Sequence, residues 1–452
     1  MRKNVQLKTA SFLVDVTPDI GFNLAYRINE KIHSNIYIRG LVIDDGKTRA
    51  ALVACDFLFI DHVTVSRWKK TIADLLDTSA ANVLIHAVHQ HDSVSAFASL
   101  ASLAEKYTGM NNFPDEYFNK ITVELADALK QALRSWRTVD CVAVSEERLQ
   151  GLASNRRILG NDGKVKDMRW SSSREELKKE PVGLIDPLLR TVAFLDKEDK
   201  VLAALHFYAT HPQSVVRGQV TSDVPGAALK YVSEHSCPDT HHIYFTGCGA
   251  NITFGKYNLA DEKKNPPDER VVRLGEQLGK GIIANLNRLE KKPIGKLEIS
   301  HDCFEMPLAG FILRASNKSL EKKILRKIEN TPENEKNPMA AIWPYGIYLE
   351  LKRNWVKLCK PRLSLLRIGN DVNILSMPSE TVVEYQLYAQ SLIPEKFLAC
   401  AAYNDGTYMY IPTAAMYREK GYEPNASVTT PAIEKAYKGA IKNILQRLET
   451  GN

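Results

Sequence analysis

The sequence predicts an α/β fold, in which a mixed β-sheet core is built from hairpins and flanked by helices. Two observations carry this expectation. Apolar runs suited to strands alternate along the chain with segments of helical periodicity. Three of these apolar segments share one plan, in which a strand, a tight polar turn and a second strand follow one another. A chain of 452 residues is long enough for one large α/β domain or for two smaller ones.

The first half of the chain supplies a hairpin, a further strand and two helices. Residues 37–57 contain an Asp-Asp-Gly turn between two apolar runs, which predicts the hairpin. An apolar strand is expected to run into the segment 82–93, which holds three histidines. Helices are expected over residues 64–76 and 115–136, because apolar residues recur there at helical spacing. The two apolar faces are Val65, Trp68, Ile72 and Leu75, and Phe118, Ile121, Leu125, Leu129 and Leu133.

The second half supplies two more hairpins, over residues 188–212 and 362–380, and a long helix over 268–289. Residues 160–180 are polar and charged, so a surface loop is expected there. Residues 315–340 are rich in lysine and glutamate, which predicts an exposed helix and loop inserted over a site. The chain closes with an amphipathic helix whose apolar residues are Ile433, Tyr437, Ala440, Ile441, Ile444 and Leu448.

Composition and charge exclude some classes of partner. Hydrophobic residues make up 44% and charged residues 25%, which is typical of a globular protein. The net charge is +7, but no basic block with interleaved aromatic residues occurs, so we expect no nucleic-acid partner. No apolar run approaches membrane-spanning length, so we expect no stable insertion into a membrane. The sequence does not set an oligomeric state.

The cysteines and the N-terminal residues predict a cytoplasmic protein. The cysteines are odd in number and widely spaced, and no CxxC motif occurs, which favours reduced thiols. The N-terminal residues have no apolar core of a secretory signal, although a chain trimmed of its leader would leave secretion open. The seven cysteines are Cys55, Cys141, Cys237, Cys248, Cys303, Cys359 and Cys400.

Polar side chains stand where predicted strands end. His89 and His91 are two residues apart, so on an extended strand both side chains would point to the same side. The second strands of the three hairpins end near Asp56, His211 and Glu380. Because open α/β sheets place their sites at strand ends, we expect these distant segments to deliver groups to one place.

Two imidazoles and one carboxylate form a common zinc set that leaves a position open for water or substrate. Each of these residues taken singly would more often be structural, and their shared placement at strand ends is what favours a Zn²⁺ site. The interpretation requires His211 and Glu380 to lie within a side chain's length of His89.

Other chemistries find little support. No HExxH motif is present, which disfavours a helix-borne zinc protease, and no GxSxG nucleophile elbow occurs. The DGKT at residues 45–48 resembles the tail of a phosphate-binding loop but lacks its first glycine, and a hairpin turn explains it better. The glycine cluster GCGAN at 247–251 lacks the full dinucleotide fingerprint and is expected to let backbone approach a ligand closely.

Short fragments in order along most of the chain resemble the neutral ceramidase superfamily. HQHDS at 89–93 resembles that family's HxHSG segment, and FYATHP at 207–212 its second histidine segment. MPSE at 377–380 resembles a Pro-Gly-Glu element, and YIPTAAMYREKGYE at 410–423 a tyrosine-rich segment. Further matches are VDVTP at 14–18, YIR at 37–39, SNRR at 154–157, SDVPGAA at 222–228 and GANIT at 249–253.

The resemblance implies a zinc-dependent hydrolase that cleaves an N-acyl amide of a small molecule. It implies that His89, His211, Glu380 and Tyr410 bind one zinc ion, that His91 and Tyr422 flank the substrate carbonyl, that Arg156 binds substrate, and that Thr253 replaces a family serine. In this scheme His91 passes a proton to the leaving amine and Tyr422 donates to the oxyanion. Asp56 and Asp223 are candidates to orient the metal-binding imidazoles.

The sequence also departs from the family pattern. Asp92-Ser93-Val94 stands in place of Ser-Gly-Pro, which adds a carboxylate beside the site, and Ser379 stands in place of a glycine. We expect a single ceramidase-like catalytic domain over residues 1–452, with surface insertions near 160–180 and 305–345. The immunoglobulin-like C-terminal domain of full ceramidases is not expected, and the substrate is not expected to be membrane ceramide.

Two alternative functions remain open. The same metal scaffold could hydrolyse another bond, such as an ester or a glycoside-linked group, because a fold does not fix the bond broken. A protein that keeps zinc only for binding is the third reading. The presence of His91 and Tyr422 argues against it, because a purely structural zinc site needs neither residue.

Overall fold

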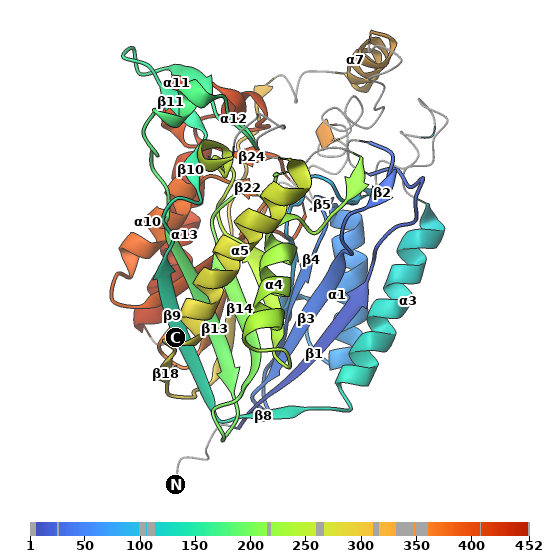
Figure 1. The fold of residues 1–452 in the computed structure, drawn as a ribbon, viewed down its shortest axis with the longest axis vertical. Coiled ribbons are helices and arrows are strands. Elements are labelled where there is room, and N and C mark those ends of the chain that lie inside the picture. The colour runs from blue at the N-terminus through green and yellow to red at the C-terminus, as the bar shows by residue number, and fades with distance from the viewer. Residues whose placement is uncertain are drawn as a thin grey trace.

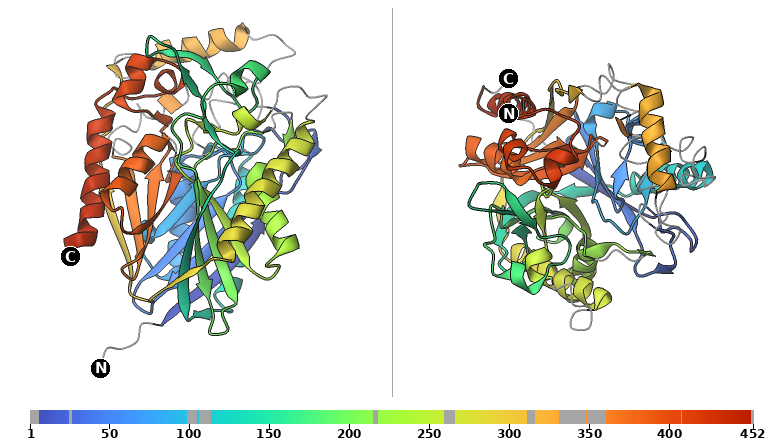
Figure 2. Two further views of the ribbon diagram at one scale, coloured as in Figure 1. Left: turned by 60° about the vertical axis from the view of Figure 1, so that its left-hand side comes forward. Right: turned by 90° about the horizontal axis from the view of Figure 1, so that it is seen from above.

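The computed structural model describes residues 6–24, 27–98, 105, 114–214, 218–258, 266–310, 316–330, 347–348, 360–406 and 408–450. This part of the chain contains two large sheets, one nine-stranded and one five-stranded. The sheets pack face to face, and helices cover the outer face of each (Figures 1 and 2). The predicted α/β class with a mixed sheet core is therefore confirmed, in a four-layer arrangement of helix, sheet, sheet and helix.

The nine-stranded sheet has the order β19-β20-β21-β23-β6-β4-β3-β1-β8. It is mixed, because β4 pairs in parallel with β6 and β21 with β23, while its other pairs are antiparallel. The strands are β1 (Leu7–Asp15), β3 (Tyr37–Asp44), β4 (Arg49–Cys55), β6 (Val83–Ala87), β8 (Arg137–Val139), β19 (Leu297–Cys303), β20 (Arg362–Ile368), β21 (Val372–Pro378) and β23 (Phe397–Asn404).

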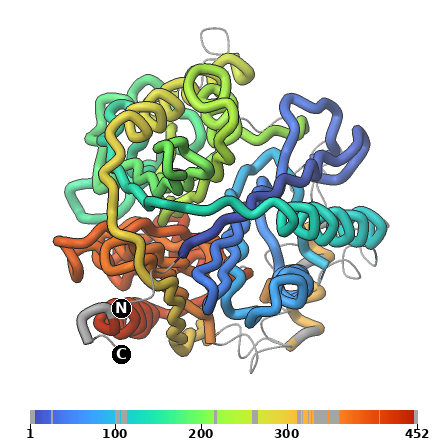
Figure 3. The backbone as a smooth tube through the Cα atoms, turned by 90° about the horizontal axis from the view of Figure 1, so that it is seen from below, coloured from blue at the N-terminus to red at the C-terminus, as the bar shows by residue number. Residues whose placement is uncertain are grey.

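The five-stranded sheet has the order β16-β14-β13-β9-β18. Its strands are β9 (Cys141–Arg148), β13 (Leu188–Leu195), β14 (Val201–Tyr208), β16 (His241–Thr246) and β18 (Glu290–Lys292). One continuous stretch of chain, residues 141–292, supplies this whole sheet, and the stretches before and after it supply the larger one (Figure 3).

The central strands are apolar throughout because both of their faces are covered. All residues of β6 and β21 are buried, and in β4 only the first is exposed. Leu52 and Leu84 of the larger sheet belong to the same apolar core as Leu205 and Phe207 of the smaller one. This core joins the sheets and fixes where their strand ends lie relative to one another.

Three helices cover the outer face of the larger sheet, namely α1 (His62–Leu76), α3 (Asp115–Ala132) and α13 (Ile433–Thr450). Helices α4 (Asp223–His235) and α5 (Pro267–Leu286) pack together over the smaller sheet, and α10 (Val383–Leu392) packs on α13. None of the helices in the described ranges is long and apolar enough to cross a membrane.

The three predicted hairpins are confirmed as β3–β4, β13–β14 and β20–β21. The four long helices are also confirmed, although α3 ends at Ala132 rather than near residue 136. Residues 160–180 are more ordered than the expected loop, because β11 (Arg157–Leu159) pairs with β12 (Val165–Met168) and a short 3-10 helix follows. The exposed helix expected after residue 315 is α7 (Asn317–Glu329), and residues 331–340 lie outside the described part.

Candidate metal centre and active site

His89 lies in the loop after β6, which ends at Ala87. The expectation that His89 and His91 stand on an extended strand is wrong, because His89 has a positive φ of 76°. Its ring is buried, stacks on Tyr403 with 4.3 Å between centroids, and places Nδ1 2.8 Å from the carbonyl oxygen of Leu58. A carbonyl only accepts, so Nδ1 holds the ring proton and Nε2 offers its lone pair.

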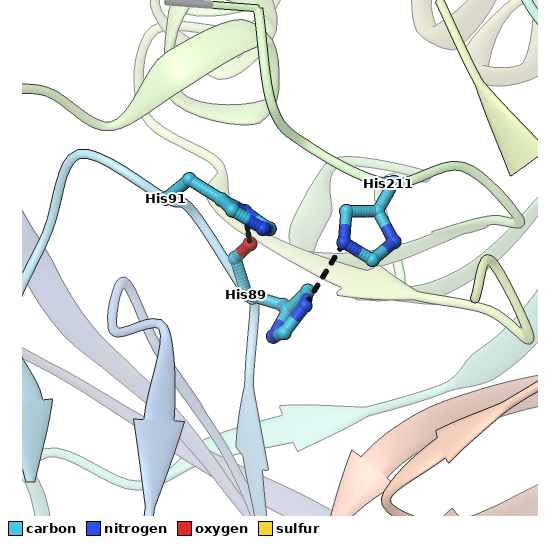
Figure 4. Close-up of side chains that lie close together, drawn as sticks. All are labelled: His89, His91 and His211. Atoms are coloured by element: carbon cyan, nitrogen blue, oxygen red, sulfur yellow. Dashed lines mark hydrogen bonds between the residues drawn. The ribbon is translucent and has the colours of Figure 1, made fainter. Parts of the chain in front are cut away.

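His211 lies three residues beyond the end of β14 and meets His89 across the two sheets (Figure 4). The Nε2 atoms of the two rings are 3.1 Å apart. The Nδ1 atom of His211 lies 3.3 Å from the carbonyl oxygen of Gly249, so this ring also turns Nε2 toward the centre. A Cβ atom on Gly249 would lie 2.8–3.0 Å from the backbone of Thr210, and the glycine permits this close approach.

Glu380 and Tyr410 approach the same centre from the C-terminal part of the chain. They pair directly in a two-stranded parallel sheet of β22 (Glu380–Thr381) and β24 (Tyr410–Ile411), and their side chains hydrogen-bond. The Oε2 atom of Glu380 lies 3.4 Å from Nε2 of His89 and has no hydrogen-bond partner in the described residues. A buried carboxylate oxygen left in this way is unusual and indicates a missing ligand.

The spacing of these atoms fits a metal ion. In a tetrahedral zinc site with bonds of about 2.0–2.1 Å, neighbouring ligand atoms are about 3.3 Å apart. The spacings of 3.1 Å between the two imidazoles and 3.4 Å from His89 to Glu380 match that edge length. His89, His91 and His211 also form a buried cluster whose ligand atoms all lie within 4.8 Å of one another. This histidine triad could therefore hold a metal ion, with Glu380 beside it.

His91 lies close to both other histidines, with ring centroids 4.9 Å from His89 and 4.8 Å from His211 (Figure 4). Its Nδ1 atom lies 3.2 Å from the carbonyl oxygen of His89. Burial lowers the pKa of His91 and of His211 well below the usual value, and the neighbouring His89 adds to the effect. Both rings are therefore neutral, which is the form that binds a metal or accepts a proton.

Arg156 lies buried beneath three aromatic rings next to this cluster. Its guanidinium carbon is 5.1 Å from the ring centroid of Tyr422, 5.3 Å from Tyr410 and 5.5 Å from Trp170. Its Nε donates to Glu423 at 2.8 Å, whereas its Nη2 has no partner among the described residues. Burial by itself would lower the pKa of Arg156, but Tyr410 and Glu423 raise it above the usual value, so the side chain stays charged.

Tyr422 is the most exposed of the predicted site residues, with 39% of its surface accessible. Its ring meets those of Tyr410 and Trp170 edge to face, with 5.3 Å between centroids in each pair. Burial of its hydroxyl, helped by the negative charge of Glu380, raises the pKa of Tyr422 to about 12. The hydroxyl therefore keeps its proton at neutral pH and can donate a hydrogen bond.

The remaining predicted residues have structural partners. The hydroxyl of Thr253 donates to the carbonyl oxygen of Trp170 at 2.8 Å and accepts from the backbone of Gly255.

The idea that Asp56 and Asp223 orient the imidazoles is wrong. Asp56 accepts hydrogen bonds from Tyr37, Arg39 and Gln90, and Asp223 accepts from Ser214 and Val224. Backbone carbonyls orient the rings instead.

His86, the first of the three histidines in residues 82–93, belongs to the core. Its Nδ1 lies 2.6 Å from the carbonyl oxygen of Ala402, and its Nε2 accepts from the backbone of Thr246 at 3.0 Å. Both ring nitrogens are thus used in joining β6 to its neighbours. This ring was not among the predicted ligands, and the structure agrees.

Sequence reasoning missed Tyr403 and left Glu423 without a role. Tyr403 is the penultimate residue of β23, stacks on His89 and brings its hydroxyl within 3.5 Å of Nδ1 of His211. Glu423 is fully buried and binds both Arg156 and Arg157. Nothing in the local pattern around Tyr403 marks it, whereas the position of Glu423 in the tyrosine-rich segment was a usable signal.

Positive φ angles concentrate around the site. Besides His89, the residues Ser379, Tyr403 and Met409 have φ between 54° and 64°, and each adjoins or contacts a candidate ligand. Such conformations cost free energy and persist where the surroundings enforce them, often at functional sites. The resemblance to the family's Pro-Gly-Glu element implies a glycine at this position, and the positive φ of Ser379 is a conformation that favours glycine.

Comparisons with known proteins indicate the fold and the family of this chain. Residues 17–265 match the family model described as neutral/alkaline non-lysosomal ceramidase, N-terminal. A search of curated proteins found no match. Among solved structures, a neutral ceramidase from Pseudomonas aeruginosa aligns with a TM-score of 0.70 and 15% identity, covering 98% of this chain and 75% of that one. A ceramidase complexed with C2 aligns with a TM-score of 0.71 and 15% identity, covering 99% of this chain and 76% of that one.

The structural likeness extends over nearly the whole chain, and the family match spans more than half of it. At 15% identity the solved structures support the fold alone. The family model adds the sequence evidence, because its range contains the segments that carry His89, His91, Arg156 and His211. The chain therefore belongs to the neutral/alkaline non-lysosomal ceramidase family.

Proposed function

We propose that this protein is a zinc-dependent hydrolase that cleaves an N-acyl amide bond. The observation that carries the proposal is the meeting of Nε2 of His89, Nε2 of His211 and the unpartnered Oε2 of Glu380 at metal-ligand spacing. Tyr410, hydrogen-bonded to Glu380, is the proposed fourth ligand. The donors are nitrogen and oxygen atoms of the kinds that zinc accepts.

A bound zinc ion supplies a Lewis acid that acidifies water and polarises a carbonyl group. The residues of the chain supply the remaining steps. His91 is neutral and sits beside both imidazole ligands, so it can take a proton and return it to the departing amine. Tyr422 donates a hydrogen bond to the oxygen that gains negative charge. Arg156 binds the substrate through its free Nη2.

Two features of the molecule support a single catalytic domain and a cytoplasmic location. A single apolar core joins the two sheets, which supports one catalytic domain with an insertion carrying α7. The cysteines Cys55, Cys141, Cys237, Cys248, Cys303 and Cys400 are free thiols, which supports a reducing, cytoplasmic environment.

The test combines metal analysis with a substrate panel. We expect about one zinc per purified chain and hydrolysis of at least one N-acyl amide among short-chain and long-chain members of a panel that also contains esters. Removal of the metal with a chelator should abolish activity, and added zinc should restore it. Turnover of esters alone would contradict the amide assignment, and zinc without turnover of any compound would contradict catalysis.

A further inference from the structure

Trp170 is the largest exposed apolar side chain near the site. It has 45% of its surface accessible and lies edge to face against Tyr422, which is 39% exposed. Among the large hydrophobic residues that are exposed in the described part of the chain, these two are the only aromatic rings in contact with each other. Exposed apolar surface beside a candidate site is typical of ligand binding.

Several hydrogen bonds of the neighbouring Arg169 hold the backbone that carries Trp170 in place. The preceding Arg169 is fully buried and donates to the carbonyl oxygens of Leu177, Asn155, Glu180 and Pro181 at 2.7–3.1 Å. Its backbone N–H donates to the carbonyl oxygen of Arg156 at 2.8 Å. The segment is therefore tied directly to a substrate-site residue.

Contacts to its carbonyl oxygen hold Trp170 itself in position. Thr253 donates to that oxygen at 2.8 Å, and a Cβ atom on Gly255 would lie only 2.1 Å from it. Residue 255 must therefore be a glycine for the two segments to approach. This anchoring holds a half-exposed indole ring at a defined position beside Tyr422 and Arg156.

We propose that Trp170 and Tyr422 form an aromatic wall that binds the acyl chain of the substrate, with Trp170 as a specificity-determining residue. The inference rests on the proposed amide hydrolysis and names the half of the substrate that the wall contacts. The charge of Arg156 indicates that this half is the acyl group. Its guanidinium carbon lies 5.1 Å from the ring centroid of Tyr422 and 5.5 Å from that of Trp170.

The two products of amide hydrolysis carry opposite charges. The acid product is a carboxylate, which the free Nη2 of Arg156 attracts, and the amine product is an ammonium ion, which the same group repels. The acyl half therefore lies over Arg156, and the first carbons beyond its carbonyl meet the aromatic wall. Aromatic faces and edges are apolar enough to bind such a chain.

The first experiment measures kcat/KM for amides that share one amine and carry acyl chains from acetyl to palmitoyl. Trp170→Ala should lower kcat/KM about tenfold for the long chains, because the apolar contact that each buried CH₂ makes is lost. The loss for the acetyl compound should be far smaller, and Trp170→Phe should retain most of the chain-length preference. Leu159→Ala, at an exposed position in β11 of the neighbouring β11–β12 hairpin, is the control and should leave the series unchanged.

An equal loss for acetyl and palmitoyl amides in Trp170→Ala would overturn the inference. A loss that follows the amine half in a second series, with one acyl group and varied amines, would also overturn it.

The second experiment does not depend on turnover. Decanoate should change the tryptophan fluorescence of the zinc-loaded protein, Trp170→Phe should remove that change, and decylammonium should not produce it. If the protein hydrolyses no amide but decanoate still changes the fluorescence through Trp170, the proposed function fails and the acyl site stands. If the protein hydrolyses amides and decanoate has no effect at Trp170, the acyl site fails alone.

Discussion

At the scale of single residues, the site depends on imidazoles whose protons are fixed by backbone carbonyls. Leu58 and Gly249 accept from the Nδ1 atoms of His89 and His211, which leaves both Nε2 atoms for a metal. Because a carbonyl oxygen only accepts hydrogen bonds, this arrangement selects the tautomer in which Nδ1 carries the ring proton. His91 is held in the same loop but is proposed to act on protons rather than on the metal.

Substitution of the histidines separates these roles. His89→Ala and His211→Ala should each lose zinc and activity, because each removes one of the two closest ligand atoms. His91→Ala should keep most of its zinc and lose activity by about 10²–10⁴-fold, the usual effect of removing a general acid–base. Zinc content of the purified variants and kcat on an N-acyl amide are the measurements. Equal zinc loss in His91→Ala would make that residue a ligand, and full activity would remove it from the mechanism.

The glycine that holds His211 gives a second prediction. Gly249→Ala should weaken zinc binding about tenfold or more without removing a ligand, since the new Cβ atom must push the backbone of Thr210 away. Zinc affinity measured by competition with a chelator tests this. The matched control is Gly439→Ala in α13, where a Cβ atom meets nothing within 4 Å. That change should leave zinc affinity alone and stabilise the helix by about 0.5–1 kcal/mol.

At the scale of elements, short pairings beyond the main sheets bring the ligands together. The two-residue strands β22 and β24 place Glu380 beside Tyr410. The hydroxyl of Ser379 strengthens this pairing, because it donates to the carbonyl oxygen of Met409 at 2.7 Å and accepts from the backbone of Tyr408 at 2.8 Å. The two buried hydrogen bonds of the Ser379 hydroxyl thus offset the backbone strain of its positive φ.

Replacement of Ser379 tests this offset. Ser379→Ala should lower the free energy of unfolding by about 1–3 kcal/mol, because it leaves two buried backbone groups without their partner. Ser379→Gly loses the same bonds but relieves the strain at φ 54°, so it should be more stable than the alanine variant by about 1 kcal/mol. Urea unfolding and zinc titration measure both effects. Wild-type stability and affinity in Ser379→Ala would mean that the hydroxyl does not hold the two strands.

Local sequence patterns predicted some of the elements and not others. The three hairpins and the long helices could be predicted because turn residues and apolar periodicity are properties of neighbouring residues. Residues 160–180 were expected to form a loop because they are polar. Part of this stretch instead forms β12, which pairs with β11, and Arg169 holds the segment that follows through hydrogen bonds to the carbonyl oxygens of Asn155 and Glu180. Polar segments ordered by a buried arginine give no periodic signal in the sequence.

At the scale of the whole molecule, the two sheets bury several histidines as neutral rings. Burial lowers the pKa of His86 to about 3 and that of His241 and His242 to about 4. In the unfolded chain the same rings have pKa values near 6.5. The folded state therefore binds fewer protons than the unfolded state as the pH falls below about 6.5, and protonation favours unfolding.

Acidification should therefore destabilise the metal-free protein. The stability contributed by these rings is fully present above about pH 6.5 and is lost as the pH falls toward 4, at up to about 1.4 kcal/mol per pH unit for each ring. Urea unfolding at about pH 7 and pH 5 should show a loss of several kcal/mol. His242→Gln should reduce that loss, and His235→Gln, at an exposed position on α4, should not. An unchanged pH dependence in His242→Gln would contradict this account of the buried rings.

The sequence by itself determined the α/β class, the hairpins and the placement of His89, His211 and Glu380 near strand ends, because these follow from local patterning. The resemblance of short motifs added Tyr410, Tyr422 and Arg156 to the same site. Only the tertiary structure decided that backbone carbonyls rather than Asp56 or Asp223 orient the imidazoles, and that Tyr403 stacks on His89.

The physical reason is one of distance along the chain. Turn chemistry and periodicity act over a few residues, whereas His89 meets His211, Tyr403 and Glu380 only because two sheets from separate stretches of chain pack on a common apolar core. Which carbonyl faces which ring, and which aromatic ring covers Arg156, is set by that packing, and no local pattern in the sequence encodes it.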